Sequence, residues 1–503
     1  MPKRELTMHS RRDFIRGLAA LTGTGLGSTL YNHRALAQTA ADPRFLIVLC
    51  AGGGGSIIDG PLAIRESECA TPETQNVFPD SVVKGFDGSP FRAVDLSGRA
   101  IGQIPSPFSV TPSTFFEKAR EDLMVSTWTR TSVNHQIGER RSVTGNEAWR
   151  GRTLQEMVAW QYGGEAPIPN VHLNPGFGFT EHGTDDTLPT YTRGQLVANP
   201  STWPLSLDGA RGQEYGLNPE VLAAVRKHRN EVFEPAGDFS KVYRNAPRIL
   251  EWQDLRGTPQ ERIEGLDLIT KLMFQSDGEG GLPLSEFGLE GSAAGEAVRS
   301  AFPDYAVDPL HAQAALAFLL LKYGVSVTVT LGPSFDFVYD DRQDYLSENS
   351  VLNTPLAFDI SHQAHRSGQA VIWDRLYKVV DGLMTLLKQE DFGDGTSFWD
   401  RSMIYVASDF GREKHRPANA SEWGTSHSLN NGVMVFSPLV PGDTLLGGVD
   451  PDTGMTYGFD PQTGDPEPGR EMAEAEIFSG LLDALNVDTS DSGLPSVPAM
   501  RRS

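Results

Sequence analysis

The chain has 503 residues, with 43 Lys and Arg against 65 Asp and Glu, which gives a formal net charge of −22. Hydrophobic residues make up 39% of the chain and charged residues 21%, which excludes a wholly disordered protein. The acidic balance argues against nucleic acid as a partner, because phosphate binding needs clustered Lys and Arg. The sequence has no uninterrupted apolar run of about 18 residues, so we expect no stable membrane span.

The first residues carry the features of an export signal. Adjacent arginines, Arg11 and Arg12, are followed by a weakly apolar stretch at 18–30 that is diluted by glycine. Ala35-Leu36-Ala37 then provides the small residues of a cleavage site. We therefore expect residues 1–37 to be a twin-arginine signal peptide that is recognised by the twin-arginine translocase. The mature protein is then predicted to be periplasmic or secreted.

Short apolar runs predict buried strands in the remainder of the chain. They lie at 45–50, 123–128, 325–331, 402–407 and 432–436. A strand that is apolar along its whole length is typical of a parallel sheet covered on both faces. An exported protein can form disulfides, but Cys50 ends one of these runs. The pattern therefore favours a buried free thiol at Cys50 over a bridge to Cys69.

Helical spacing of apolar residues occurs between these strands. It is found at 151–160, 219–300, 311–323, 371–387 and 471–485. Pro, Gly and Thr dominate 161–218, which predicts irregular loops there. Strands that alternate with helices indicate an α/β fold with a doubly wound sheet. We expect residues 41–503 to form one domain with a loop-rich and helical insertion at about 161–300.

Polar side chains follow the predicted strands, and in α/β sheets ligands bind beyond the carboxyl ends of the strands. Carboxylates and imidazoles are ligands for divalent metals, and arginines suit an anionic substrate group. The interpretation keeps a structural alternative for each, such as a turn-forming role for an aspartate in a glycine-rich loop. Spacing could place His362 and His365 on one face, but a solvated helical turn explains them equally well. The candidate metal ligands are Asp59, Asp336, Asp409 and His427, and the candidate catalytic residues are His135, Arg140 and Arg412.

The order of these motifs resembles the domain of unknown function 1501 family, exported proteins related to the alkaline phosphatase and sulfatase superfamily. The segments that carry the resemblance are SRRDF, LIVLCAGGGGSIID, VSTWTRTSVNHQIGERRSVTG, VSVTVTLGPSFD, IYVASDFGR, GTSHSLNNGVMVF and AEIFSGLLDALNVD. The resemblance implies a doubly wound mixed sheet sandwiched by helices, with one or two divalent metals at its site. It implies metal-ligand roles for Asp59, Asp409 and His427.

The chain also departs from the family pattern. The third predicted strand ends in Phe335-Asp336-Phe337-Val338, which keeps an aspartate and lacks the histidine of the family's Trp-Asp-Thr-His. Two functions from different classes follow. The first is an exported metal-dependent hydrolase that acts on phosphate or sulfate esters, with a small anionic ester or a polysaccharide as substrate. The second is a non-catalytic binding or scaffold protein with a degraded metal site.

Overall fold

The computed structural model describes residues 42–95, 112–129, 132–173, 178–206, 219–246, 268–276, 288–333 and 358–502. The predicted signal peptide and Asp336 lie outside these ranges. The chain divides into two compact units, one made of residues 1–34 and 208–268 and the other of 35–207 and 269–503. In the first unit the described residues form α6 (Pro219–His228), α7 (Glu234–Ala236) and α8 (Asp238–Val242).

The second unit is built on a sheet of eight strands in the order β12-β4-β11-β8-β1-β7-β5-β6. β11 runs antiparallel to both of its neighbours, β4 and β8, and every other pairing in the sheet is parallel. The predicted α/β fold with a mixed sheet is therefore confirmed. The strands are β1 (Phe45–Cys50), β4 (Leu123–Thr129), β5 (Asn170–His172), β6 (Gln195–Leu196), β7 (Thr328–Leu331), β8 (Ser402–Ala407), β11 (Asn430–Phe436) and β12 (Thr444–Leu446).

The single reversed strand brings distant segments to one edge of the sheet. β1, β4 and β8 all end at this edge, whereas β11 begins there, since Asn430 pairs with Thr129 at the end of β4. Residues that follow β1, β4 and β8 can therefore meet residues that precede β11. Among the described residues, three short antiparallel pairs lie outside the sheet: β2 (Val83–Gly85) with β3 (Arg92–Val94), β9 (Gly411–Arg412) with β10 (His427–Ser428), and β13 (Gly448–Val449) with β14 (Thr456–Tyr457).

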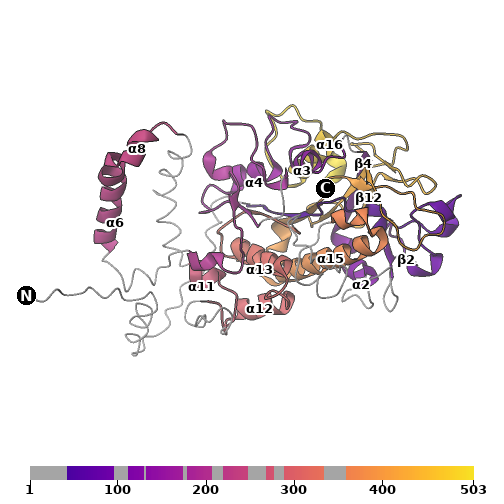
Figure 1. The fold of residues 1–503 in the computed structure, drawn as a ribbon, viewed down its shortest axis with the longest axis horizontal. Coiled ribbons are helices and arrows are strands. Elements are labelled where there is room, and N and C mark those ends of the chain that lie inside the picture. The colour runs from indigo at the N-terminus through magenta and orange to yellow at the C-terminus, as the bar shows by residue number, and fades with distance from the viewer. Residues whose placement is uncertain are drawn as a thin grey trace, which may run out of the picture. The chain divides into compact units, whose positions relative to one another are not determined.

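Helices cover both faces of the sheet (Figure 1). On one face lie α3 (His135–Thr144), α4 (Leu154–Tyr162) and α16 (Glu474–Ala484). On the other lie α2 (Pro112–Ala119), α12 (Ala293–Ala301), α13 (Pro309–Lys322) and α15 (His365–Gln389). The short α11 (Leu268–Leu272) begins at the boundary between the two units. β1 and β8 are buried along their whole length, as strands between two helical layers must be.

Most predicted elements in the described ranges lie where the apolar patterns place them, with ends shifted by a few residues. Of the predicted helical stretch at 219–300, residues 247–267 and 277–287 lie outside the described residues. Two short strands, β5 and β6, occur where loops alone are predicted. Cys50 and Cys69 are both buried and free, which confirms the predicted absence of a bridge. Within the described ranges, every helix is too short or too polar to cross a bilayer.

Candidate metal centre

Four side chains converge at the edge where β11 begins. His135, Asp359, His362 and His427 each offer one ligand atom, and these atoms all lie within 4.8 Å of one another. Nε2 of His135 is 3.2 Å from Oδ1 of Asp359, and Nε2 of His362 is 3.3 Å from the same oxygen. The four residues come from three remote segments, at 135, 359–362 and 427. We refer to them as the ligand cluster.

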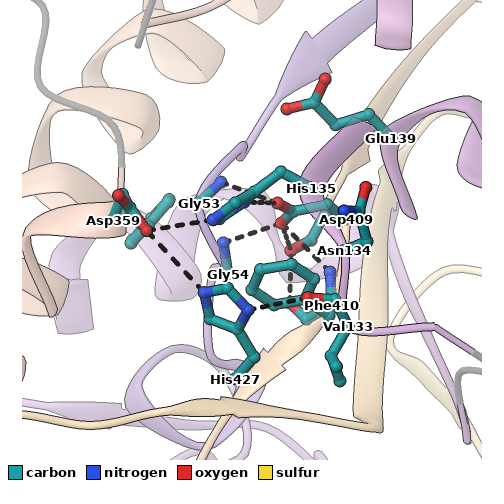
Figure 2. A network of polar contacts seen from close by, with 12 residues as sticks. Gly53, Gly54, Val133, Asn134, His135, Glu139, Asp359, Asp409, Phe410 and His427 are labelled. Atoms are coloured by element: carbon teal, nitrogen blue, oxygen red, sulfur yellow. Dashed lines mark hydrogen bonds and ion pairs between the residues drawn. The ribbon is translucent and has the colours of Figure 1, made fainter. Parts of the chain in front are cut away.

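His135 is placed by the helix that follows β4. Asn134 caps α3 by accepting a hydrogen bond from the Ile137 amide at 3.2 Å, so His135 is the first helical residue. Nδ1 of His135 lies 2.7 Å from Oδ2 of Asp409, which follows β8 (Figure 2). A carboxylate behind a histidine fixes the tautomer and the orientation of the ring, as it does in metal sites. Asp409 thus sits behind the ligand cluster rather than within it.

The glycine-rich turn after β1 holds the Asp409 carboxylate. The amides of Gly53 and Gly54 donate to its two oxygens at 3.1 and 2.7 Å, and the Phe410 amide donates to Oδ1 at 3.1 Å. Both glycines have positive φ, at 92° and 87°. A Cβ on Gly53 would lie 2.3 Å from the Asp359 backbone nitrogen. The turn therefore needs glycine both for its backbone conformation and for its close approach to the cluster.

His427 is held by β10, where it pairs with Arg412 on β9. Its Nδ1 lies 2.7 Å from the Val133 carbonyl oxygen, which can only accept, so Nδ1 carries the proton. Its Nε2 is 2.8 Å from Nε2 of His362. The side chain of His427 is 21% exposed and that of His362 is 43% exposed, so solvent reaches one side of the ligand cluster.

Asp359 is held as a carboxylate by its neighbours. Burial would raise the pKa of Asp359, but the hydrogen bond from His135 and the charges of His135 and Arg412 hold it well below its usual range. Nη2 of Arg412 lies 3.0 Å from Oδ1 of Asp359. The Arg412 side chain is fully buried and also donates to the carbonyl oxygens of Gly53 and Thr425. It orients Asp359 and lies beneath the site rather than at its open side.

The carboxylate of Asp409 also contributes to the pKa shifts of His135 and Glu139. Burial would lower the pKa of His135, but hydrogen bonds to Asp359 and Asp409 outweigh it and raise that pKa to about 9. One helical turn further on, burial and the charge of Asp409 raise the pKa of Glu139 to about 8. His135 therefore carries a second proton near neutral pH, and its positive charge offsets part of the negative charge of Asp359 and Asp409.

The other predicted site residues lie elsewhere. Asp59 is buried and binds His365 and Asn76, at 3.1 and 2.8 Å from its Oδ2. Arg140 forms ion pairs with Glu147 and Glu181. The structure therefore brings together His427, His135, Asp409 and Arg412 of the predicted set and places Asp59 and Arg140 outside the cluster. Asp336 falls outside the described residues.

Two residues of the cluster, Asp359 and His362, are absent from the predicted set. They lie on a short 3-10 helix, Phe358–His362, which places residues three apart on the same side. The Asp-x-x-His spacing was the available signal. No apolar strand precedes this segment, so the expectation that ligands follow strand ends does not apply to it.

The donor set fits a divalent metal. Three imidazole nitrogens and one carboxylate oxygen form a ligand set of the kind that binds Zn²⁺ and related ions. The Nδ1–H of His427 is bonded to a carbonyl oxygen and Nδ1 of His135 faces a carboxylate, which leaves their Nε2 atoms for the ion. The Nε2 atoms of His362 and His427 face each other at 2.8 Å, a hydrogen-bond distance, and as two ligands of one tetrahedral ion they would lie about 3.3 Å apart.

Comparisons with known proteins add little to this geometry. The chain matches no family model, and no curated protein matches its sequence. It is similar to a solved structure described as Ps i-CgsB in complex with k-i-k-neocarrahexaose, at 10% identity over 91% of this chain and 75% of that chain. The TM-score is 0.32, which is too low to support an argument about function.

Proposed function

We propose that this protein is an exported, metal-dependent hydrolase of phosphate or sulfate esters. The observation that carries the proposal is the convergence of His135, Asp359, His362 and His427 at one solvent-accessible edge of the sheet. The resemblance of the sequence motifs to the alkaline phosphatase and sulfatase superfamily supports the same reaction class. The anionic ester is either a small molecule or part of a polysaccharide.

In this proposal the four cluster residues hold the ion, which when bound supplies Lewis acidity and activates a water or hydroxyl. Asp409 keeps His135 oriented, and Arg412 keeps Asp359 ionised and in place. The charges near the site are two carboxylates, Asp359 and Asp409, against one guanidinium and a divalent ion. The balance is −2 against +3, which leaves one positive charge to attract an anionic group.

The second candidate is a non-catalytic binding or scaffold protein, and two observations favour it. Both oxygens of Asp409 are occupied by hydrogen bonds, and only one group of metal-binding side chains occurs within the described ranges. The resemblance implies one or two metals. A centre with one ion provides fewer charges to stabilise a transition state, which a binding function does not need.

Elemental analysis and an ester panel separate these two functions. The chain is purified, stripped with chelator and reloaded separately with Zn²⁺, Mn²⁺, Ca²⁺ or Fe²⁺. The panel consists of 4-nitrophenyl phosphate, 4-nitrophenyl sulfate and a sulfated polysaccharide. The hydrolase predicts one ion per chain and turnover that is lost in D359A but retained in D308A, which replaces the buried aspartate at the N-cap of α13. One ion without turnover, or no ion and no turnover in a stable protein, favours the non-catalytic protein with a degraded metal site and contradicts the hydrolase.

Export is a separate part of the proposal, supported by the sequence of residues 1–37. Replacement of Arg11 and Arg12 by lysine keeps the charge of the segment and removes the arginine pair. The folded protein is then expected to stay inside the cell, whereas the unmodified chain is expected in the exported fraction. Equal export of both would contradict a twin-arginine route.

A further inference from the structure

Asp59 and His365 form a buried pair beside the two loops that carry three of the cluster residues. The Asp59 side chain is 3% exposed and the His365 side chain is fully buried, and Oδ2 of Asp59 lies 3.1 Å from Nε2 of His365. On the opposite side of the ring, Nδ1 of His365 lies 3.0 Å from Oγ1 of Thr425. The three residues form a continuous chain of contacts from the turn after β1 to the loop before β10.

Thr425 extends this chain to the loop that carries Asp359 and His362. Its hydroxyl lies 3.2 Å from the Ser361 carbonyl oxygen, and its amide donates to the same oxygen at 2.8 Å. The His365 amide donates to the Trp423 carbonyl oxygen at 2.7 Å. The 358–365 and 423–428 segments are thus cross-linked immediately behind their metal-binding residues.

The hydrogen-bond directions make Asp59 the end of the chain. Burial would raise the pKa of Asp59, but His365 and Arg366 lower it, so Asp59 accepts as a carboxylate. The Thr425 hydroxyl has one proton, which it can donate to Nδ1 of His365 or to the Ser361 carbonyl oxygen, and the Thr425 amide bonds Ser361 in either case.

We propose that Asp59 and His365 are positioning residues that set the spacing between the two metal-binding loops, and that Asp59 acts through His365 rather than as a metal ligand. This inference rests on the proposed metal centre. Oδ2 of Asp59 is already occupied by His365 and Asn76, and Asp59 is absent from the ligand cluster. The pair holds Ser361 and Thr425 in place. Ser361 immediately precedes His362 in the sequence, and Thr425 lies two residues before His427.

The test compares D59N, H365Q and the double variant for Co²⁺ affinity and for the visible spectrum of the Co²⁺-loaded protein. Substitution of a residue that orients a metal ligand lowers metal affinity by about 10–100-fold. We expect each single variant to weaken Co²⁺ binding by about that factor. The double variant should bind Co²⁺ about as tightly as the single variant with the lower affinity, because both substitutions break the same chain of contacts. The spectrum of the loaded protein should keep its band positions, because the four ligands are unchanged.

Two controls separate positioning from other roles. D308N removes another buried, paired aspartate and should lower the melting temperature without changing Co²⁺ affinity. T425V is the milder variant if D59N does not fold, and it should weaken Co²⁺ binding in the same direction. Altered bands in D59N but not in H365Q, or additive losses in the double variant, would show that Asp59 is a ligand and overturn the inference.

Hydrogen exchange in the metal-free protein keeps this test independent of the proposed function. D59N and H365Q should both speed amide exchange in 358–365 and in 423–428, and D308N should not. If the unmodified chain binds no Co²⁺, the proposed metal centre fails, but faster exchange in both segments would still support the positioning role. Unchanged exchange in either segment would contradict it.

Discussion

Nδ1 of His427 donates to the carbonyl oxygen of Val133, across 294 residues of sequence and at 2.7 Å. The bond fixes the tautomer, so Nε2 presents its lone pair to the centre of the ligand cluster. Val133 precedes α3, whose first residue is His135. One backbone oxygen therefore couples the segment that carries His135 to the ring of His427, and both imidazoles face the same point.

The close approach of the glycine turn predicts a large effect of one added methyl group. In Gly53→Ala the Cβ would clash with the Asp359 backbone nitrogen at 2.3 Å. The alanine would also have to adopt the positive φ of 92° that glycine has there. We expect the free energy of unfolding to fall by about 2–4 kcal/mol, from the clash and the left-handed backbone together. Metal affinity should fall as well, because Asp359 moves. Denaturant titration and metal titration measure the two effects.

Gly88→Ala is the matched control for this substitution. Gly88 also has positive φ, at 73°, but a Cβ there would meet nothing within 4 Å. It should cost only about 1 kcal/mol of stability and leave metal binding unchanged. Equal losses in the two variants would show that backbone conformation alone explains the glycine at 53.

The buried guanidinium of Arg412 should contribute to metal affinity as well as to the stability of the fold. Arg412→Leu leaves Asp359 and several carbonyl oxygens without their partner, and Arg375→Leu does the same to the buried Asp308. Loss of one partner of a buried pair costs about 3–5 kcal/mol, and less where a carboxylate is partly exposed, as Asp359 is. Both variants should be less stable, but only Arg412→Leu should bind metal more weakly. Equal metal affinity in the two would contradict a role for Arg412 in holding Asp359.

A buried histidine outside the site should make stability depend on pH. Burial and the nearby His182 lower the pKa of His172 to about 3. Between pH 3 and the unfolded value of about 6.5 the unfolded chain binds more protons at this residue, so its contribution to stability is complete above pH 6.5 and is lost as the pH falls. The loss is about 1.4 kcal/mol per pH unit.

His172→Leu removes this titration. The free energy of unfolding, measured by denaturant titration at pH 6.5, 5.5 and 4.5, should fall less steeply in the variant than in the unmodified chain. The quantity compared is the slope with pH, because the substitution also changes packing against Gly194. Parallel slopes would mean that His172 is protonated in the folded protein.

The sequence predicts the layers of the fold because the strands are apolar along their whole length and the helices are spaced between them. It also predicts His135, Asp409, Arg412 and His427 near one edge, since these follow or precede such strands. It does not predict Asp359, because a 3-10 helix has no apolar periodicity to mark it.

The exact role of each residue depends on tertiary contacts that spacing does not reveal. Asp59 and Asp409 both follow buried strands and have the same chemistry. Asp409 meets His135 and two glycine amides, whereas Asp59 meets His365 and Asn76. Which carboxylate contacts which ring is set by how the loops pack over the sheet.

X-ray absorption spectroscopy of the Zn²⁺-loaded protein tests the central claim most directly. The account predicts one tightly held ion per chain, with three imidazole nitrogens and one carboxylate oxygen at about 2.0–2.2 Å. The imidazole signal should be reduced in H362A and unchanged in D308A. A protein that retains no ion after dialysis, or one whose ion keeps the same ligands in H362A, would contradict the metal centre described here.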